Sequence, residues 1–380
     1  MYSPRNYGEM IADSTRTRAY VRAIAGSVRP DDTVLELGCG PGLFSLLACR
    51  AGARKVYAIE SEEIVHHARS LAAANGLETR IEFLHTDSRR AQLPERVNVI
   101  VFDLRGNLPL FECAIPSIED ARQRFLAPAG IMIPRRDIMK AAIVEASDYY
   151  SRLTSPWRVF EPEIDLSRSL MLILNDSYTA YFKEDQLLTE SKRWCVLDYQ
   201  AGVTPNAAGD LCFHAMRAGT AHGICVWFEA ELSDGIEFSS GPGDVRGVYG
   251  QRFFPWPQPV SLEAGQEIQI SLHADLVGDQ YVWRWDTRIP ERTKDSGRCF
   301  LQSTFQGANL APDSLRRRAA DFVPSLSEDG QANRWVLQAI DGRASLQEIA
   351  QAAAKRFPRS FPCWEDALHR AADLAAQFSR

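Results

Sequence analysis

The sequence predicts an α/β domain with a parallel sheet, followed by an antiparallel β domain and a small helical domain. Between residues 31 and 134, short apolar strands alternate with amphipathic helices, whereas after about Arg136 single apolar and polar residues alternate. Helical patterns return near Ser325. Because one hydrophobic core seldom exceeds roughly 250–300 residues, a chain of 380 residues needs several domains. We expect them at residues 1–135, 136–312 and 325–380.

Five strand-like segments in the first domain indicate the parallel sheet. Two of the helices between them stop at glycines, Gly52 and Gly76, which often end helices. Strands that alternate with helices of this length indicate βαβ units. Ligands of such sheets bind beyond the carboxyl ends of the strands, where we expect the functional residues. The strand-like segments are "DTVLELG", "KVYAIE", "RIEFLHTD", "VNVIVFD" and "GIMIP".

The two later domains have different patterns. "CVWFEAEL", "EIQISLHADL" and "YVWRWDTRI" alternate as strands of an antiparallel sheet do. The Gly- and Pro-rich segments "SSGPGD" and "FFPWPQP" are expected to separate such strands. The last domain contains two helical patterns around an Asp-Gly turn.

Composition excludes several classes of protein. A net charge of −6 and a pI near 5.7 do not provide the basic surface of a nucleic-acid binder and favour a cationic substrate. The absence of a long apolar run or a secretory leader predicts a cytoplasmic protein that does not enter a membrane. Eight cysteines without a CxxC pair indicate reduced thiols. We therefore predict no metal site, since the neighbouring His66 and His67 would point to different sides of a helix.

The segment "LELGCGPG" follows a strand and opens a helix, so its amides converge on a shared point. Gly38, Gly40 and Gly42 have the spacing G-x-G-x-G, whereas a dinucleotide fingerprint requires G-x-G-x-x-G. With Glu36 before it, this loop resembles that of class I S-adenosylmethionine methyltransferases. A nicotinamide enzyme and a simple tight turn are the alternatives.

Polar residues also end the next two strands. Glu60 can accept both hydroxyls of a ribose, and Asp87, followed by Ser88, can reach an adenine amine. Features at three consecutive strand ends are more specific than any one of them. Together they predict a nucleoside cofactor.

From about residue 7 to 310 the chain resembles a divergent bacterial protein arginine methyltransferase. The resemblance lies in "YGEMIADSTRTRAY", "ELGCGPGLFSLLACRAGARKVYAIE", "FDLRGNLPLFE" and "ARQRFLAPAGIMIP". It implies a Rossmann-like domain and a β-barrel-like domain, with S-adenosyl-L-methionine as cofactor and S-adenosyl-L-homocysteine as product. It further implies that Met10 packs on the sulfonium and that Arg16 pairs with the cofactor carboxylate. The cofactor-binding residues expected in this way are Tyr7, Met10, Arg16, Glu36, Gly38, Cys39, Gly40, Gly42, Leu43, Glu60, Ser61, Asp87 and Ser88.

The segment "FDLRGNLPLFE" stands in place of the family's double-glutamate loop, which places Asp103 and Glu112 on the substrate nitrogen. A guanidinium has a pKa above 12 and spreads its charge over three nitrogens. Two carboxylates that grip it can fix its plane and leave one nitrogen facing the methyl group. The alternatives are an ion pair between Asp103 and Arg105 that closes the strand, and an exposed loop acid at Glu112.

Three residues depart from the family pattern. Asp103 is shorter than glutamate by one bond of about 1.5 Å, and a misplacement of ~1 Å can cost roughly a hundredfold in rate. Arg105 replaces a methionine and could neutralise Asp103 or grip a substrate carboxylate. "FFPWPQPV" is placed at the Thr-His-Trp loop, so Trp256 is either a site residue or part of the β core, and Pro255 replaces the histidine. The expected catalytic residues are Asp103, Glu112, Arg105 and Trp256.

The segment "RWVLQAIDGRASLQEIAQAAAKRFP" resembles the small winged-helix-like PqqD domain, the peptide chaperone of pyrroloquinoline quinone biosynthesis. Such domains hold leader peptides, although a plain helical cap is the alternative. The sequence thus predicts methylation of a guanidine or amine nitrogen in arginine, a small metabolite or a peptide, in a bacterial natural product pathway. Methylation of a carboxylate or hydroxyl, and a non-catalytic peptide-binding role, are the alternatives. "EIDLSRSLMLILNDSYTAYF" could be the remnant of an arm that forms a homodimer.

Overall fold

The computed structural model describes residues 3–158, 164–243, 245–290, 297–309 and 311–379. The chain divides into two compact units, Met1–Ala308 and Asn309–Arg380, which we call the main unit and the C-terminal unit. The main unit contains both the parallel sheet and the β domain.

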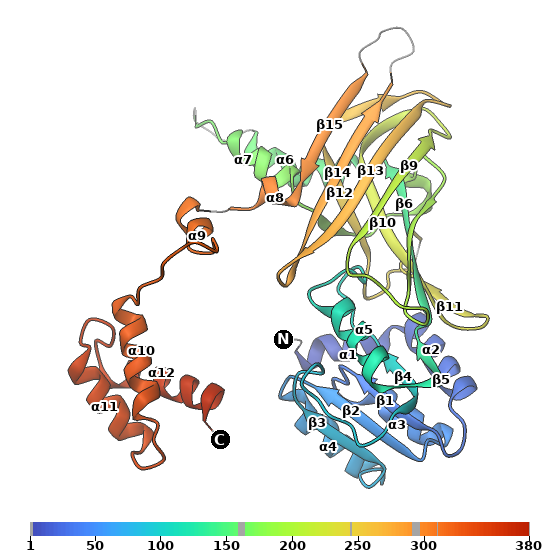
Figure 1. Cartoon of the computed structure of the whole chain (residues 1–380). Helices are drawn as coiled ribbons and strands as arrows, with labels where there is room; N and C mark the ends of the chain where they lie inside the picture. Colours follow the sequence, from blue (N-terminus) through green and yellow to red (C-terminus); the bar gives the residue numbers. More distant parts are fainter. Residues whose placement is uncertain (1–2, 159–163, 244, 291–296, 310, 380) are drawn as a thin grey trace. The chain divides into compact units, whose positions relative to one another are not determined.

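A five-stranded parallel sheet forms the N-terminal part of the main unit (Figure 1). Its order is β3-β2-β1-β4-β5. Strands β1 to β3 are added toward one edge of the sheet and β4 and β5 toward the other, so the order of the strands reverses between β1 and β4. Loops that leave the carboxyl ends of two such strands diverge and open a crevice for a ligand. The α/β prediction is confirmed. The elements are α1 (Pro4–Ala12), α2 (Ser14–Ser27), β1 (Thr33–Leu37), α3 (Leu43–Ala51), β2 (Lys55–Glu60), α4 (Ile64–Ala74), β3 (Ile81–His85), β4 (Val97–Phe102), α5 (Ala114–Phe125) and β5 (Leu126–Ile133).

The β domain consists of two antiparallel sheets, as predicted. One has the order β7-β12-β10-β6-β8, with β11 paired to β10, and the other has the order β15-β14-β13-β9. Phe254 packs on Trp283 and Trp285 across the two sheets, with ring centroids 5.1 and 5.2 Å apart. The elements are β6 (Arg136–Val144), α6 (Ser147–Thr154), α7 (Arg168–Leu174), β7 (Tyr178–Ala180), β8 (Lys192–Asp198), β9 (Ala207–His214), β10 (Gly219–Ser233), β11 (Ile236–Ser239), β12 (Gln251–Leu262), β13 (Glu267–Val277), β14 (Gln280–Ile289), β15 (Arg298–Ser303) and α8 (Thr304–Gly307), besides two short 3-10 turns (Ser155–Trp157 and Glu184–Gln186).

The prediction that "FFPWPQP" separates strands is wrong, because this segment lies inside β12. Proline has no N–H to donate, so it fits a strand only at a bulge or along an unpaired edge. Pro255 pairs with Gly223 beside a shift in the register of β10 and β12. Pro257 and Pro259 lie beyond the end of β7, which pairs only with residues 251–253.

The C-terminal unit is helical, with α9 (Pro312–Arg316), α10 (Glu328–Ala339), α11 (Leu346–Arg356) and α12 (Trp364–Phe378). Side chains of Ser327 and Ser345 cap α10 and α11. Small apolar residues of all three long helices, such as Ala332, Ala350 and Ala371, form its core. No strand is assigned in residues 309 and 311–379, so the winged part of the predicted domain is not seen there. None of the described helices is long and apolar enough to cross a membrane.

Candidate functional site

A cavity of about 560 Å³ opens beyond the carboxyl ends of β1 to β4. This volume lies in the range of cavities that bury a ligand of a few hundred daltons. Helix α1 contributes Tyr7 and Met10 to its wall, so the N-terminal segment covers the loop between β1 and α3. The residues predicted for the cofactor that line it are Tyr7, Met10, Arg16, Glu36, Gly38, Cys39, Gly40, Leu43, Glu60, Ser61, Asp87 and Ser88.

The glycine loop is shaped for close approach. Gly38 and Gly40 have φ of 69° and 51°, a region that side chains strain. A Cβ on Gly40 would lie 2.7 Å from Cε1 of Tyr7, so the ring packs directly on the backbone. Gly42 does not line the cavity; it precedes α3 with φ of 82° and faces Ala68.

Two acids hold this loop in place. Glu60 accepts hydrogen bonds from the backbone N–H of Gly40 (2.8 Å) and of Glu62 (3.0 Å), and it still lines the cavity. Glu36 is buried and accepts from the N–H of Ser45 at 2.7 Å, inside the first turn of α3. Burial raises the pKa of Glu36 to about 8, although Ser45 opposes the shift. Glu36 therefore holds the first turn of α3 that follows the loop.

Asp87 and Ser88 follow β3 and line the cavity. Its carboxylate accepts from the N–H of Arg89 at 2.8 Å and pairs with the Arg89 guanidinium at 3.0 Å. These hydrogen bonds lower the pKa of Asp87 and keep it an acceptor.

Asp103 is fully engaged. Its Oδ1 accepts from Arg105 Nη1 at 2.5 Å, and its Oδ2 lies 2.5 Å from Arg16 Nη2 and accepts from Tyr249 OH at 2.5 Å. Burial would raise the pKa of Asp103, but the charges of Arg16 and Arg105 outweigh it and lower the pKa. The resemblance predicted that Arg16 pairs with a cofactor carboxylate. In this structure, Arg16 pairs with the carboxylate of Asp103.

Arg105 is buried and lines both cavities, but its guanidinium is held by neighbouring side chains. Its Nε and Nη2 donate to the two oxygens of Asp137 at 3.0 and 2.7 Å, and its Nη1 donates to Tyr20 OH at 2.8 Å. Tyr199 OH donates to Asp137 at 2.6 Å. This geometry corrects the expectation that Arg105 grips a substrate carboxylate, because its fork is already occupied.

A second cavity of about 540 Å³ adjoins the first. Glu112 lines both cavities, is exposed, and has a left-handed φ of 42°. Its carboxylate makes no hydrogen bond or ion pair with any residue that the structure describes. Strained backbone of this kind gathers at functional sites. Five residues line both cavities: Met10, Arg105, Phe111, Glu112 and Tyr249.

Trp256 does not belong to this site, which corrects its prediction as a catalytic residue. It is completely buried in the β domain and lines neither cavity. The residue that β12 and its preceding loop present to the site is Tyr249, which the sequence analysis did not single out. Its only signal in the sequence is a tyrosine beside Gly250, a few residues before the strand.

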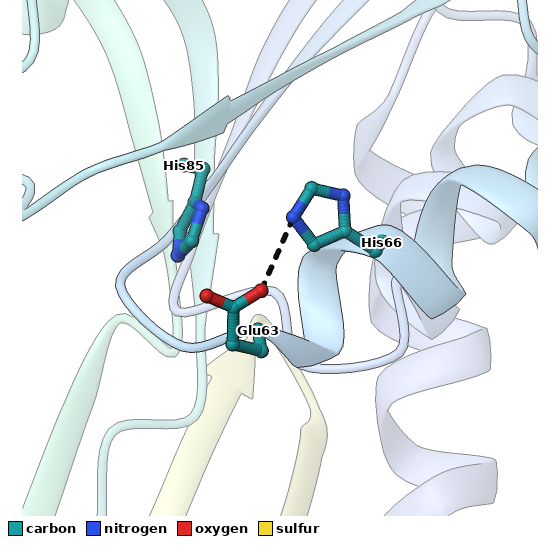
Figure 2. Close-up of side chains that lie close together, drawn as sticks. All are labelled: Glu63, His66 and His85. Carbon is teal, nitrogen blue, oxygen red and sulfur yellow. Dashed lines mark ion pairs between the residues drawn. The ribbon is translucent and has the colours of Figure 1, made fainter. Parts of the chain in front are cut away.

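Three possible metal ligands meet at the surface, at the start of α4 and the end of β3 (Figure 2). His66 Nε2 lies 3.2 Å from Glu63 Oε2, and ligand atoms of Glu63, His66 and His85 all lie within 4.8 Å of one another. All three residues are exposed, and His85 Nε2 lies 3.2 Å from the carbonyl oxygen of Ser61. No metal site was predicted from the sequence, because Glu63 and His66 meet His85 only through the packing of α4 beside β3.

Comparisons with known proteins agree with this geometry. Residues 34–130 match a family model described as a methyltransferase domain. The chain is 29% identical over 275 residues to protein arginine N-methyltransferase 1 of Schizosaccharomyces pombe, covering 69% of this chain and 79% of that one. It is 28% identical to protein arginine N-methyltransferase 6 of Xenopus tropicalis, over 71% and 81% of the two chains.

A solved structure of the Trypanosoma brucei PRMT1 enzyme–prozyme complex with AdoHcy has the same fold, with a TM-score of 0.73 at 21% identity. The match covers 78% of this chain and 97% of that one. The cavity here suits the same cofactor, since Gly38 and Gly40 of the loop line it and Glu60 adds a carboxylate that could accept hydrogen bonds from a ribose. The chain is an S-adenosylmethionine-dependent methyltransferase that is similar in sequence and fold to protein arginine N-methyltransferases.

Proposed function

We propose that the enzyme methylates a terminal nitrogen of an arginine-type guanidinium. The observation that carries this proposal is Glu112, an exposed carboxylate without a partner in the described structure, at the junction of the cofactor cavity and the second cavity. A carboxylate there attracts a cation and can accept hydrogen bonds from two of its N–H groups. We call the second cavity the acceptor cavity.

The bound cofactor supplies an electrophilic methyl group on a positively charged sulfur. Glu112 holds the guanidinium so that one nitrogen faces that methyl group, and orientation of this kind can supply much of the rate. By drawing positive charge toward the nitrogens it binds, Glu112 leaves more lone-pair density on the nitrogen that reacts. It then accepts the proton that this nitrogen loses.

Asp103 acts differently from the clamp that the sequence suggested. It lines the cofactor cavity and not the acceptor cavity, and its two oxygens are occupied by Arg16, Arg105 and Tyr249. Arg16 keeps unused N–H groups on both Nη atoms, since it has five donors. We propose that these donors bind the cofactor carboxylate while Asp103 fixes the guanidinium of Arg16.

The proposal includes a peptide as acceptor and a second copy of the chain as partner. A peptide acceptor in a natural product pathway would give the C-terminal unit a role as a leader-peptide domain. A homodimer would use the segment around α7, where Met171 is 61% exposed. Methylation of a carboxylate is less favoured, because Arg105 is paired with Asp137.

The test is radiolabelled methyl transfer to arginine, simple guanidines and arginine-containing peptides. We expect a labelled guanidinium with the unaltered enzyme and a loss of at least about a hundredfold in kcat for Glu112→Gln, with cofactor affinity retained. Glu78→Gln, an exposed glutamate outside both cavities, is the matched control. Transfer to carboxylates or hydroxyls alone would contradict the proposal.

A further inference from the structure

The acceptor cavity contains an arginine, Arg252, whose charge has no role in the proposed methyl transfer. Arg252 of β12 lines it, and its Nε donates to Ser177 Oγ at 2.9 Å. It makes no ion pair with a carboxylate of the described residues. Arg105, the other arginine of this cavity, is by contrast paired with two aspartates. Arg252 is thus a charged group that the fold leaves without an anion.

The groups around Arg252 do not replace a direct partner. Asp176, Tyr149 and Tyr178 lie near enough to act on its charge. Asp176 lines the same cavity but is exposed, and its Oδ1 accepts from the N–H of Ser177 at 2.7 Å. Burial lowers the pKa of Arg252 despite these groups. Removing a guanidinium from water without pairing it with a carboxylate raises the free energy of the folded protein. A ligand that brings a carboxylate to Arg252 would therefore bind favourably.

The rest of the cavity suits a small ligand of mixed charge. Glu112 provides a negative group at the junction with the cofactor cavity, while Arg252 provides a positive one on the β domain. Phe111, Tyr281 and Trp283 add aromatic side chains to its lining. The volume of about 540 Å³ is that of a small-molecule site.

We propose that the acceptor carries a carboxylate as well as a guanidinium, and that Arg252 binds this carboxylate. Arginine as a free amino acid has this chemistry, with both groups on one flexible chain. The inference rests on the proposed function, since Glu112 is taken to bind the guanidinium. A carboxylate at the C-terminus of a peptide ending in arginine has the same chemistry, and the experiment separates the two sources.

The experiment measures binding to the enzyme loaded with S-adenosylhomocysteine, by calorimetry. The ligands are arginine, arginine amide, a peptide ending in a free arginine, and a capped peptide with an internal arginine. Because a hydrogen-bonded charge pair is at stake, we expect arginine to bind about tenfold to a hundredfold more tightly than arginine amide. Tighter binding of the peptide with a free C-terminal arginine would assign the carboxylate to a peptide end.

The variants isolate Arg252. Arg252→Gln is expected to abolish the preference for arginine over its amide, and Arg252→Lys to keep part of it. Arg284→Gln changes an arginine of β14 outside both cavities and should leave the preference intact. Thermal unfolding confirms that each variant is folded.

Two outcomes overturn the inference: equal binding of arginine and arginine amide, or a preference that survives in Arg252→Gln. Tighter binding of the capped peptide, independent of Arg252, does so as well. Methyl transfer measured in parallel separates the two proposals. Transfer that does not depend on Arg252 refutes only the carboxylate site, whereas binding that depends on Arg252 without transfer to any guanidinium refutes only the proposed function.

Discussion

Arg105 and Asp137 form a two-point ion pair in the interior of the main unit, with Nε to Oδ2 at 3.0 Å and Nη2 to Oδ1 at 2.7 Å. Asp137 has no exposed surface, and it belongs to β6, whereas Arg105 belongs to the loop after β4. The pair therefore joins the β domain to the loop that carries Asp103 and Glu112. Arg105 and Glu112 of this loop line both cavities, so the pair anchors part of their wall.

Removing one partner of this pair should destabilise the fold strongly. Asp137→Asn leaves the Arg105 charge buried without its carboxylate, for which we expect a loss of about 3–5 kcal/mol. Denaturant unfolding measures it. The double variant Asp137→Asn with Arg105→Met removes the orphaned charge and should recover part of the loss. Equal stability of Asp137→Asn and the unaltered protein would show that the pair is not a constraint.

A methyl group on Gly40 should weaken cofactor binding. The added Cβ would meet the ring of Tyr7 at 2.7 Å, in a loop whose φ is 51°. We expect the Kd for S-adenosylmethionine to rise about tenfold or more in Gly40→Ala, measured by calorimetry. Gly76→Ala is the control, because its φ is 66° but nothing lies within 4 Å of its Cβ. It carries the same backbone strain of about 1–2 kcal/mol, so a similar loss of affinity there would disprove the steric argument.

Glu36 should make stability depend on pH in one direction. Burial raises its pKa from 4.5 to about 8, so the folded state binds a proton that the unfolded state releases in this interval. Its contribution is full below pH 4.5 and is lost as the pH rises to about 8. Unfolding free energies of Glu36→Gln relative to the unaltered protein should show this slope. Glu119→Gln should show the opposite slope, because hydrogen bonds from Arg122 lower the pKa of Glu119.

Tyr249 and Trp256 should separate catalysis from folding. Tyr249→Phe removes the hydroxyl that binds Asp103 and Arg16, so we expect a fall of about tenfold in kcat/KM with little change in Tm. Trp256→Phe leaves a gap in the core of the β domain and should lower stability by about 1–3 kcal/mol while kcat changes little. Steady-state rates and thermal unfolding of both variants check this. The reverse pattern would return Trp256 to the site.

Methyl transfer should not require a metal. The cofactor brings its own electrophile, and the exposed cluster of Glu63, His66 and His85 lies outside the two cavities. Dialysis against a chelator is expected to leave kcat unchanged within about twofold. His85→Ala serves as the control for any residual metal effect. A chelator-sensitive rate that His85→Ala also loses would assign this cluster a role.

The layout of the parallel sheet and of the cofactor loop follows from local sequence. The five strands and the ends of α3 and α4 were predicted because apolar runs and glycines act over a few residues, and Gly52 does end α3 with φ of 116°. The β domain and the helical character of the last unit were predicted in the same way. Asp103 and Glu112 were predicted as site residues because they follow a buried strand whose carboxyl end faces the ligand in such sheets, and both line the cofactor cavity.

What the sequence by itself determined is therefore the elements and the chemistry at their ends. Only the tertiary structure decided which charges meet. Asp137 lies 32 residues beyond Arg105 and Tyr249 lies 146 beyond Asp103, so no local pattern reveals these pairs. The prolines of β12 led to a wrong prediction for the same reason. The strand accommodates them because its register with β10 shifts and because β7 pairs with only its first residues, and neither feature is visible in the local sequence. Pairing across the fold depends on burial, where an ion must find its partner, and burial is set by the whole chain.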